Sequence, residues 1–313
     1  MRRILWLSLI LLSAACGVQK ELKPIQRFEE LSYPYEVKKA LLSGGIEVAY
    51  VDEGKGEQTL LFIHGLGSYL PAWKKNIEGL KEKYRCIAID LPGYGKSSKG
   101  EYSGSMRFYS EIVAELIDKL KLGSVTLVGH SMGGQISIIT ALAFPDKVDK
   151  LVLIAPAGFE TFTKGQKQWF REVMTANLVK LTTVEQIKSN LASNFYRMPK
   201  DARFMITDRI DMRGAEDFEA YCYIIPQCVQ GMVDDPVYEF LPKITQPTLI
   251  IFGENDNLIP NRYLNPGKTG TIARKGAERI PNATLHLLPE TGHFVQFEKA
   301  AEVNGLMAEF LEH

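Results

Sequence analysis

The sequence predicts an α/β fold: an open, doubly wound, mostly parallel sheet with a helical cap inserted after the sixth strand. From residue 37 onward, short apolar runs alternate with helix-length segments, which is the pattern of βαβ units. Most runs are continuously apolar, as expected for strands that are covered on both faces. The alternation is interrupted once, between residues 154 and 248, where helical patterning replaces it.

The predicted elements follow in chain order. Residues 37–42 and 46–51 flank a Gly-Gly pair and are typical of a β-hairpin. Further strands are expected at residues 60–63, 86–89, 125–128, 151–154, 249–252 and 285–288, and helices at 106–120 and 135–144. A long loop without structure is uncommon in a compact domain. Residues 159–241 are therefore predicted to form the helical cap, and residues 37–158 and 242–313 the core.

Composition sets the broad class of the protein. Of 313 residues, 45% are hydrophobic and 24% are charged, which excludes wholly disordered, collagen-like and multi-span membrane chains. The 37 basic residues balance the 37 acidic ones, so we expect no nucleic-acid partner, and no obligate protein partner is evident. Four cysteines are too few for a disulfide scaffold. Cys222 and Cys228 would face different sides of one helix unless Pro226 breaks it, so a disulfide between them stays open.

The chain begins with a pattern typical of exported proteins. Two arginines precede the apolar residues 4–12, a stretch too short to cross a hydrocarbon core, which needs about 20 residues. Small residues and Cys16 follow, so residues 1–15 are predicted to be a signal peptide. The position of Cys16 resembles a bacterial lipoprotein signal, in which the cysteine is lipidated. Cleavage after Ala15 to free a secreted or periplasmic soluble protein, and an uncleaved anchor, are the alternatives.

The residues after Cys16 bear on location. Residues 16–36 are polar and contain two prolines, so they are predicted to be a tether. The residue after the cysteine is Gly17, not the aspartate that retains lipoproteins in the inner membrane. The resemblance therefore implies an outer-membrane lipoprotein of the bacterial cell envelope.

The strongest catalytic signal is the stretch Gly129-His130-Ser131-Met132-Gly133, which lies between a predicted strand and a predicted helix. A sharp strand-to-helix turn strains the backbone of its central residue and projects that side chain from the sheet edge. The positions two residues away must be glycine-sized, because larger side chains would clash within the turn. Ser131 is therefore the candidate nucleophile. The N–H of Met132, at a helix N-terminus, is a candidate oxyanion donor.

The other candidate residues follow three further strands. Leu66, after the strand at 60–63, is the candidate second oxyanion donor, and its neighbour His64 is expected to be structural. His293, after the last strand, is the candidate base, as the chain order Ser, acid, His requires. The orienting acid should follow the preceding strand, where Asp256 is favoured and Glu254 is the alternative. A further carboxylate, Asp90, lies in the turn after the strand at 86–89 and is expected to be structural.

These segments, together with residues 90–97, resemble the α/β-hydrolase superfamily from about residue 37 to the end. The GHSMGGQ stretch and the following AFPDKVDKLVLIAPAG are similar to the branch that contains monoacylglycerol lipases, carboxylesterases and meta-cleavage-product hydrolases. In that family the nucleophile, acid and base correspond to Ser131, Asp256 and His293. Serine at position 131 disfavours the epoxide hydrolases and haloalkane dehalogenases, which use aspartate there.

The resemblance implies a serine hydrolase that cleaves carboxylic esters with medium, apolar acyl chains, without a metal or cofactor. Two alternatives stay open: hydrolysis of a carbon–carbon bond in a dienoic diketone, and a catalytically inactive binding protein on the same fold. Export to the envelope argues against the first, since aromatic catabolism is usually cytoplasmic. The complete triad argues against the second.

The lipoprotein hypothesis predicts that Cys16→Ser blocks attachment to the membrane. A single acyl chain binds a membrane marginally, whereas two or more chains hold a protein stably. Cells grown with a radiolabelled fatty acid should therefore yield labelled wild-type protein in the membrane fraction and unlabelled Cys16→Ser protein. A wild-type protein without label would contradict lipidation and favour a soluble, secreted form.

Overall fold

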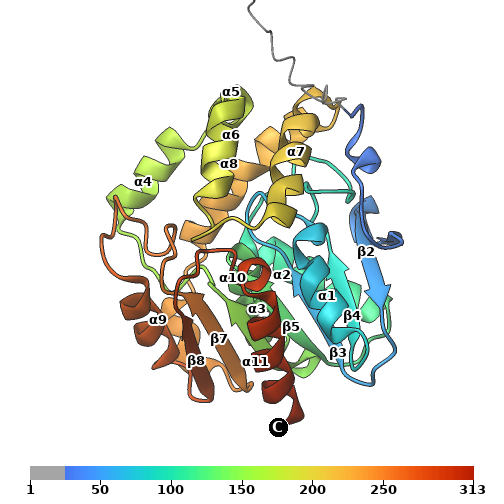
Figure 1. Cartoon of the computed structure of the whole chain (residues 1–313), viewed down its shortest axis with the longest axis vertical. Helices are drawn as coiled ribbons and strands as arrows, with labels where there is room; N and C mark the ends of the chain where they lie inside the picture. The colour runs from blue at the N-terminus through green and yellow to red at the C-terminus, as the bar shows by residue number, and fades with distance from the viewer. Residues whose placement is uncertain (1–24) are drawn as a thin grey trace, which may run out of the picture.

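The computed structural model describes residues 25–313, so the predicted signal peptide, Cys16 and residues 17–24 of the predicted tether lie outside the described residues. Eight strands form one sheet in the order β1-β2-β4-β3-β5-β6-β7-β8 (Figure 1). Strand β1 (Lys38–Leu41) pairs antiparallel with β2 (Glu47–Glu53), and β2 pairs antiparallel with β4. All other neighbouring strands are parallel. The predicted open, mostly parallel sheet with an initial hairpin is confirmed.

The remaining strands lie where the apolar runs predict them. They are β3 (Thr59–Ile63), β4 (Arg85–Ile89), β5 (Val125–His130), β6 (Val148–Ile154), β7 (Thr248–Gly253) and β8 (Ala283–Leu288). Strands β3 and β5 to β7 are covered on both faces, as their continuous apolar sequences predict. Strand β8 departs from this expectation: Leu285 and Leu287 are only half-buried because β8 is the edge strand and has a neighbour on one side only.

Helices cover both faces of the sheet. Helices α1 (Lys74–Leu80) and α11 (Ala300–Glu312) lie together on one face, and α2 (Met106–Lys119) and α3 (Met132–Ala143) pack against each other on the opposite face (Figure 1). Helix α3 begins three residues earlier than predicted, because Gly133 and Gly134 belong to its first turn. Two further helices flank β8 in the chain, α9 (Thr269–Ala277) and α10 (Val295–Glu298).

Seven short 3-10 helices connect these elements. They are η1 (Phe28–Glu30), η2 (Ser43–Gly45), η3 (Leu70–Trp73), η4 (Pro145–Lys147), η5 (Lys200–Ala202), η6 (Met212–Gly214) and η7 (Tyr238–Lys243) within the described residues.

The insertion between β6 and β7 is helical, as predicted, and forms a cap at one end of the sheet (Figure 1). Its α-helices are α4 (Lys164–Val173), α5 (Ala176–Leu181), α6 (Val184–Ala192), α7 (Arg203–Asp211) and α8 (Phe218–Asp234). Helix α8 continues through Pro226, and its two cysteines, Cys222 and Cys228, are buried and free. The disulfide left open by the sequence is therefore absent in this part of the chain.

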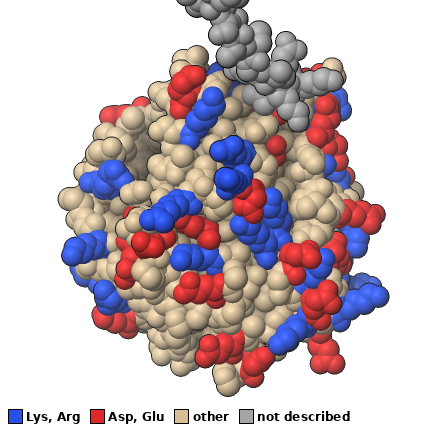
Figure 2. Space-filling model, viewed as in Figure 1, with Lys and Arg blue, Asp and Glu red and all other residues tan. Residues whose placement is uncertain are grey.

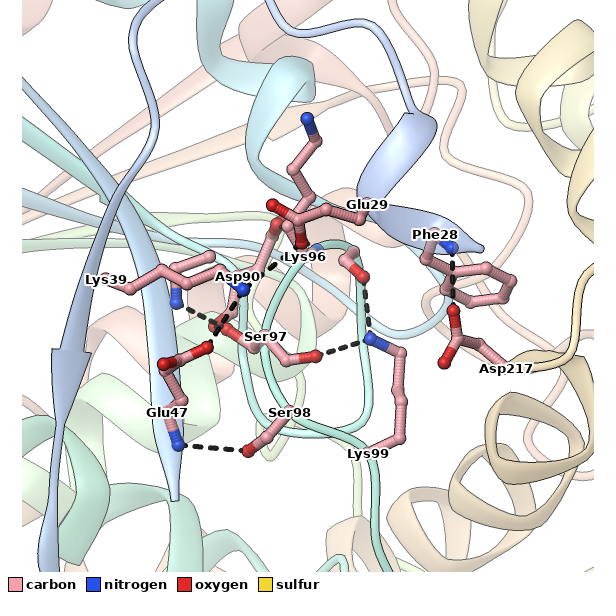
Figure 3. Close-up of polar contacts among 12 residues, drawn as sticks. Phe28, Glu29, Lys39, Glu47, Asp90, Lys96, Ser97, Ser98, Lys99 and Asp217 are labelled. Carbon is pink, nitrogen blue, oxygen red and sulfur yellow. Dashed lines mark hydrogen bonds and ion pairs between the residues drawn. The ribbon is translucent and has the colours of Figure 1, made fainter. Parts of the chain in front are cut away.

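Residues 25–36, which we call the N-terminal strap, belong to the fold. Phe28 is fully buried and Leu31 is 4% exposed. The backbone N–H of Phe28 donates to Asp217 Oδ2 at 2.7 Å, at the start of α8 (Figure 3). The predicted tether over residues 16–36 is thus wrong for its second half. Burial of the two apolar side chains offsets the conformational entropy that the segment loses.

The turn after β4 anchors the strap to the core through Asp90. Asp90 Oδ2 accepts hydrogen bonds from the Tyr33 hydroxyl at 2.5 Å and from the Lys96 N–H at 2.8 Å, and Oδ1 accepts from Leu70 N–H at 2.7 Å. The Lys99 ammonium donates to the Gly95 carbonyl at 2.7 Å, and its burial lowers the Lys99 pKa to about 8. The structural role predicted for Asp90 is confirmed by these three accepted bonds.

Charged side chains of both signs are interspersed over the face shown in Figure 2, in keeping with the zero net charge of the sequence. Within residues 25–313, no helix combines the length and the apolar character needed to cross a bilayer.

The strap predicts a large effect of Phe28→Ala. Deleting a fully buried phenylalanine side chain costs about 3–5 kcal/mol of unfolding free energy. Leu41→Ala, at a position that is 59% exposed, should change it by less than about 0.5 kcal/mol. Urea unfolding of both variants measures the difference. Equal midpoints for Phe28→Ala and wild type would mean that the strap is a free tether after all.

Candidate active site

Ser131 lies on a strained turn between β5 and α3. Its backbone angles, φ 54° and ψ −117°, fall where residues other than glycine are rarely found. A Cβ atom at Gly133 would clash with the carbonyl oxygen of Ile63, and one at Gly129 with that of Gly133. The strain and the need for glycine at both positions are confirmed. Ser131 is partly buried and lines a cavity.

His293 and Asp256 form a buried pair. The Nδ1 atom of His293 lies 2.7 Å from Asp256 Oδ2, and the two side chains are 4% and 0% exposed. The other carboxylate oxygen, Oδ1, accepts from the N–H groups of Leu258 at 2.7 Å and Ile259 at 3.1 Å. Because an ionised carboxylate only accepts, Nδ1 of His293 carries a proton, which leaves Nε2 free to accept one. The alternative acid, Glu254, is exposed on the surface.

The cap holds the backbone of the His293 loop. The N–H groups of His293 and Phe294 both donate to the Asn194 carbonyl, at 2.7 and 3.1 Å. Gly292 N–H donates to Glu298 Oε2 at 2.8 Å. The sequence contains no signal for the Asn194 contact, because it joins residues about a hundred positions apart. The position of the histidine therefore depends on the cap as well as on the core.

His130, the residue before Ser131, packs against the candidate base. Its Nε2 donates to the His293 carbonyl at 3.0 Å, and the two imidazole rings lie 4.8 Å apart between centroids. Burial, assisted by the neighbouring His293, holds the pKa of His130 well below its ordinary value. His130 is therefore neutral, and it does not compete with His293 for a proton. The sequence contains no signal for this contact, because it joins residues 163 positions apart.

The loop after β3 packs directly on Ser131. A Cβ atom at Gly65 would lie 3.0 Å from the Ser131 Cβ. His64 braces this loop: its Nδ1 donates to the Gly65 carbonyl at 2.8 Å, and its Nε2 accepts from Leu91 N–H at 3.1 Å. Burial lowers the pKa of His64, so it stays neutral in this role. Its predicted structural function is confirmed.

The two predicted oxyanion donors come from separate segments that both adjoin Ser131: α3 and the loop after β3. Met132 opens α3, and Leu66 lines the cavity next to Ser131. In residues 25–313, neither backbone N–H donates to a protein acceptor. Both are thus available to a ligand, and the Met132 N–H has the additional field of the helix N-terminus.

The cavity has two lobes beneath the cap. We call the lobe of about 300 Å³ that contains Ser131 and His293 the serine lobe, and the lobe of about 510 Å³ under α5 to α8 the cap lobe. They share the lining residues Leu66, Met174, Asn194 and Phe294. The serine lobe is otherwise mostly apolar, with Phe162, Phe170, Val229, Met232, Val233, Leu258 and Ile259 in its wall.

One carboxylate lines the serine lobe. Glu160 accepts hydrogen bonds from Asn261 N–H at 3.0 Å and Asn265 Nδ2 at 2.7 Å. Burial raises its pKa. Among the described residues, no lysine or arginine lines this lobe, so an anionic group is not favoured there.

Comparisons with known proteins agree with this architecture. Residues 58–300 match the family model described as alpha/beta hydrolase fold. The chain is 28% identical over 283 residues to a 2-hydroxy-6-oxononadienedioate/2-hydroxy-6-oxononatrienedioate hydrolase of Burkholderia vietnamiensis, which covers 85% of this chain and 91% of that protein. A probable hydrolytic enzyme from Pseudomonas aeruginosa superposes with a TM-score of 0.81 at 25% identity, covering 93% of this chain and 99% of that one.

A third relative is longer than this chain. The dihydrolipoyllysine-residue acetyltransferase component of the acetoin cleaving system of Pseudomonas putida is 32% identical over 260 residues, which is 82% of this chain and 64% of that protein. The present chain thus spans less than two thirds of that relative. The family model, by contrast, spans the described chain from the segment before β3 to the start of α11, with every candidate site residue of the core inside it. The chain therefore belongs to the alpha/beta hydrolase fold family.

Proposed function

We propose that the protein is a serine hydrolase that cleaves carboxylic esters with apolar acyl chains, monoacylglycerols included. The observation that carries the proposal is the 2.7 Å bond between His293 and Asp256, in a cavity that also contains Ser131. A histidine oriented by a buried carboxylate next to a serine on a strained turn is the arrangement required for nucleophilic acyl transfer.

In the proposed mechanism, Ser131 Oγ attacks the ester carbonyl while His293 Nε2 accepts its proton. Asp256 keeps the proton of the imidazole on Nδ1 and stabilises the imidazolium that forms. His293 then donates the proton to the departing alkoxide, and an acyl-enzyme remains on Ser131. A water molecule, activated by the same histidine, hydrolyses the acyl-enzyme and restores the serine.

The free N–H groups of Leu66 and Met132 would hold the negative charge of the tetrahedral intermediate. Two preorganised donors stabilise that charge more than solvent does, because they need no reorganisation during the reaction. The apolar wall of the serine lobe supports an acyl chain as the group bound there. Each methylene removed from water contributes about 0.8 kcal/mol.

The relative named as a dienedioate hydrolase favours a second candidate, hydrolysis of a carbon–carbon bond. A dienedioate carries two carboxylates, and one of them would meet Glu160 if it entered the serine lobe. This repulsion is the reason for preferring esters. Parallel assays with a p-nitrophenyl ester and a dienoic diketone acid distinguish the two reactions, and labelling by a fluorophosphonate distinguishes either enzyme from an inactive binding protein.

We also propose that the protein works at the bacterial cell envelope, attached through Cys16. The strap enters the fold beside the cap, where Glu216 N–H donates to the Gln26 carbonyl at 2.9 Å. An anchor that precedes the strap would then attach at the cap side of the molecule, the side of the cavity. Esters derived from lipids would be the substrates nearest to it.

Ser131→Ala is expected to lower kcat for p-nitrophenyl ester hydrolysis by at least about 10⁴-fold, because only binding and the oxyanion donors remain. The melting temperature should stay close to that of the wild type, since Ala removes one partly exposed hydroxyl. A fluorophosphonate should label the wild type and not the variant. Near-normal turnover by Ser131→Ala would refute the assignment of the nucleophile.

The two candidate acids predict opposite results for two conservative variants. Asp256→Asn should lower kcat by about 10⁴-fold, the scale expected when the imidazole tautomer is no longer fixed. Glu254→Gln, on the exposed side of the same loop, should change kcat little. Steady-state kinetics on one ester decides between them, and the reverse ranking would show that Glu254 is the acid.

A further inference from the structure

The cap lobe contains a single charged side chain. Of the lysines and arginines within residues 25–313, only Arg209 of α7 lines either lobe. The rest of the cap lobe is apolar or carries uncharged amides and a hydroxyl, such as those of Gln186, Asn190 and Thr182. A single cation in an otherwise apolar and uncharged wall is typical of a site that binds an amphipathic anion.

Arg209 has unused donors. In the described chain, its guanidinium makes one hydrogen bond, from Nη2 to the Gly67 carbonyl, and lies 4.6 Å from the ring centroid of Tyr221. The adjacent carboxylate, Asp208, accepts a hydrogen bond from the Tyr69 hydroxyl and is not paired with Arg209. A guanidinium offers five N–H donors in a planar fork that fits the two oxygens of a carboxylate or phosphate.

The hydroxyl of Tyr221 is a second donor beside the Arg209 guanidinium. Tyr221 is 1% exposed, and its hydroxyl has no hydrogen-bond partner among the described residues. Burial raises the pKa of Tyr221 to about 12, so the hydroxyl keeps its proton at neutral pH. A Cβ atom at Gly67 would lie 3.2 Å from this hydroxyl and 3.3 Å from Arg209 Nη2, so both groups meet at the bare Cα of Gly67.

We propose that Arg209 and Tyr221 form an oxyanion-binding subsite in the cap lobe, which selects esters that carry a carboxylate or phosphate group. The inference rests on the proposed ester hydrolysis and extends it to the class of substrate. The charge contrast between the lobes orients such a substrate: Glu160 repels its anionic end from the serine lobe, and Arg209 attracts it to the cap lobe. The scissile carbonyl then lies between them, near the shared lining residue Leu66.

The subsite is adjacent to the oxyanion loop. Gly67, whose carbonyl accepts from Arg209, directly follows Leu66, whose N–H is a proposed oxyanion donor. Arg209 therefore contacts the same loop whose Leu66 N–H is proposed to stabilise the transition state. An anion bound by Arg209 would lie beside that loop. Arg209 and Tyr221 touch the substrate away from the reacting atoms, so they act on specificity.

Two matched pairs of esters test the proposal. The first compares monobutyrin with 1-butyrylglycerol 3-phosphate, which puts a phosphate on the alcohol part. The second compares p-nitrophenyl pentanoate with the p-nitrophenyl monoester of glutaric acid, which puts a carboxylate on the acyl part. Wild-type protein should prefer the anionic member of at least one pair by about tenfold or more in kcat/KM.

Arg209→Met should lower that anionic-to-neutral ratio by about 10- to 100-fold, the range for a charged hydrogen bond, and Tyr221→Phe by a smaller factor. Arg203→Met is the matched control, because Arg203 is exposed on the same helix and lines neither lobe; its ratio should equal that of the wild type. Equal losses on both members of each pair would show that Arg209 only supports the Gly67 loop, and would overturn the proposal. So would a wild type without preference.

A binding assay separates this proposal from the proposed function. Calorimetry with the Ser131→Ala variant should show tighter binding of 1-butyrylglycerol 3-phosphate than of monobutyrin, and Arg209→Met in that background should remove the difference. If the wild type hydrolyses no ester but this difference is found, the proposed function fails and the subsite stands. If esters are hydrolysed without any Arg209-dependent difference in rate or binding, the subsite fails and the function stands.

Discussion

The close approach of helix α3 to strand β3 is the constraint on which the candidate site depends. Gly133 lies against the carbonyl oxygens of Ile63 and His64 so closely that a Cβ atom would not fit. This contact places the strained turn at Ser131 against the loop after β3. The available N–H groups of Leu66 and Met132, which belong to separate parts of the chain, therefore lie near the same serine. A methyl group at Gly133 would push the turn and the loop apart, so the backbone strain at Ser131 persists only because the packing around it is close.

The base is positioned by a different set of contacts. Asp256 is held by two backbone N–H groups and holds His293 in turn, while the cap residue Asn194 accepts from two N–H groups of the histidine loop. The His293 carbonyl accepts from His130, the neighbour of the serine. The turn of the nucleophile and the loop of the base are thus joined by a bond from the His130 side chain to the His293 backbone, as well as by the chemistry proposed for them. A movement of the cap near Asn194 would therefore displace the loop of the base directly.

Local sequence patterns predicted the strands and the turn at Ser131, because each depends on residues within about ten positions of one another. The order of the candidate residues came instead from the chain order Ser, acid, His. Contacts over longer separations leave no such pattern. The bond from His130 to His293 and the position of Arg209 at Gly67 belong to this class. The strap differs from the predicted tether for the same reason: Phe28 and Leu31 are isolated apolar residues in a polar segment, and no local pattern shows that the fold buries them.

The strap ties one part of the cap to the core. Phe28 N–H bonds to Asp217 and the Gln26 carbonyl accepts from Glu216, so the start of α8 is tied to the core. Helices α4 and α5, by contrast, contain no buried residue, although they wall both lobes of the cavity. Segments with few buried apolar contacts open at the lowest free-energy cost. We therefore expect α4 and α5 to open more readily than the start of α8, although opening must break the ion pairs of Arg171 with Asp234 and of Lys180 with Glu219.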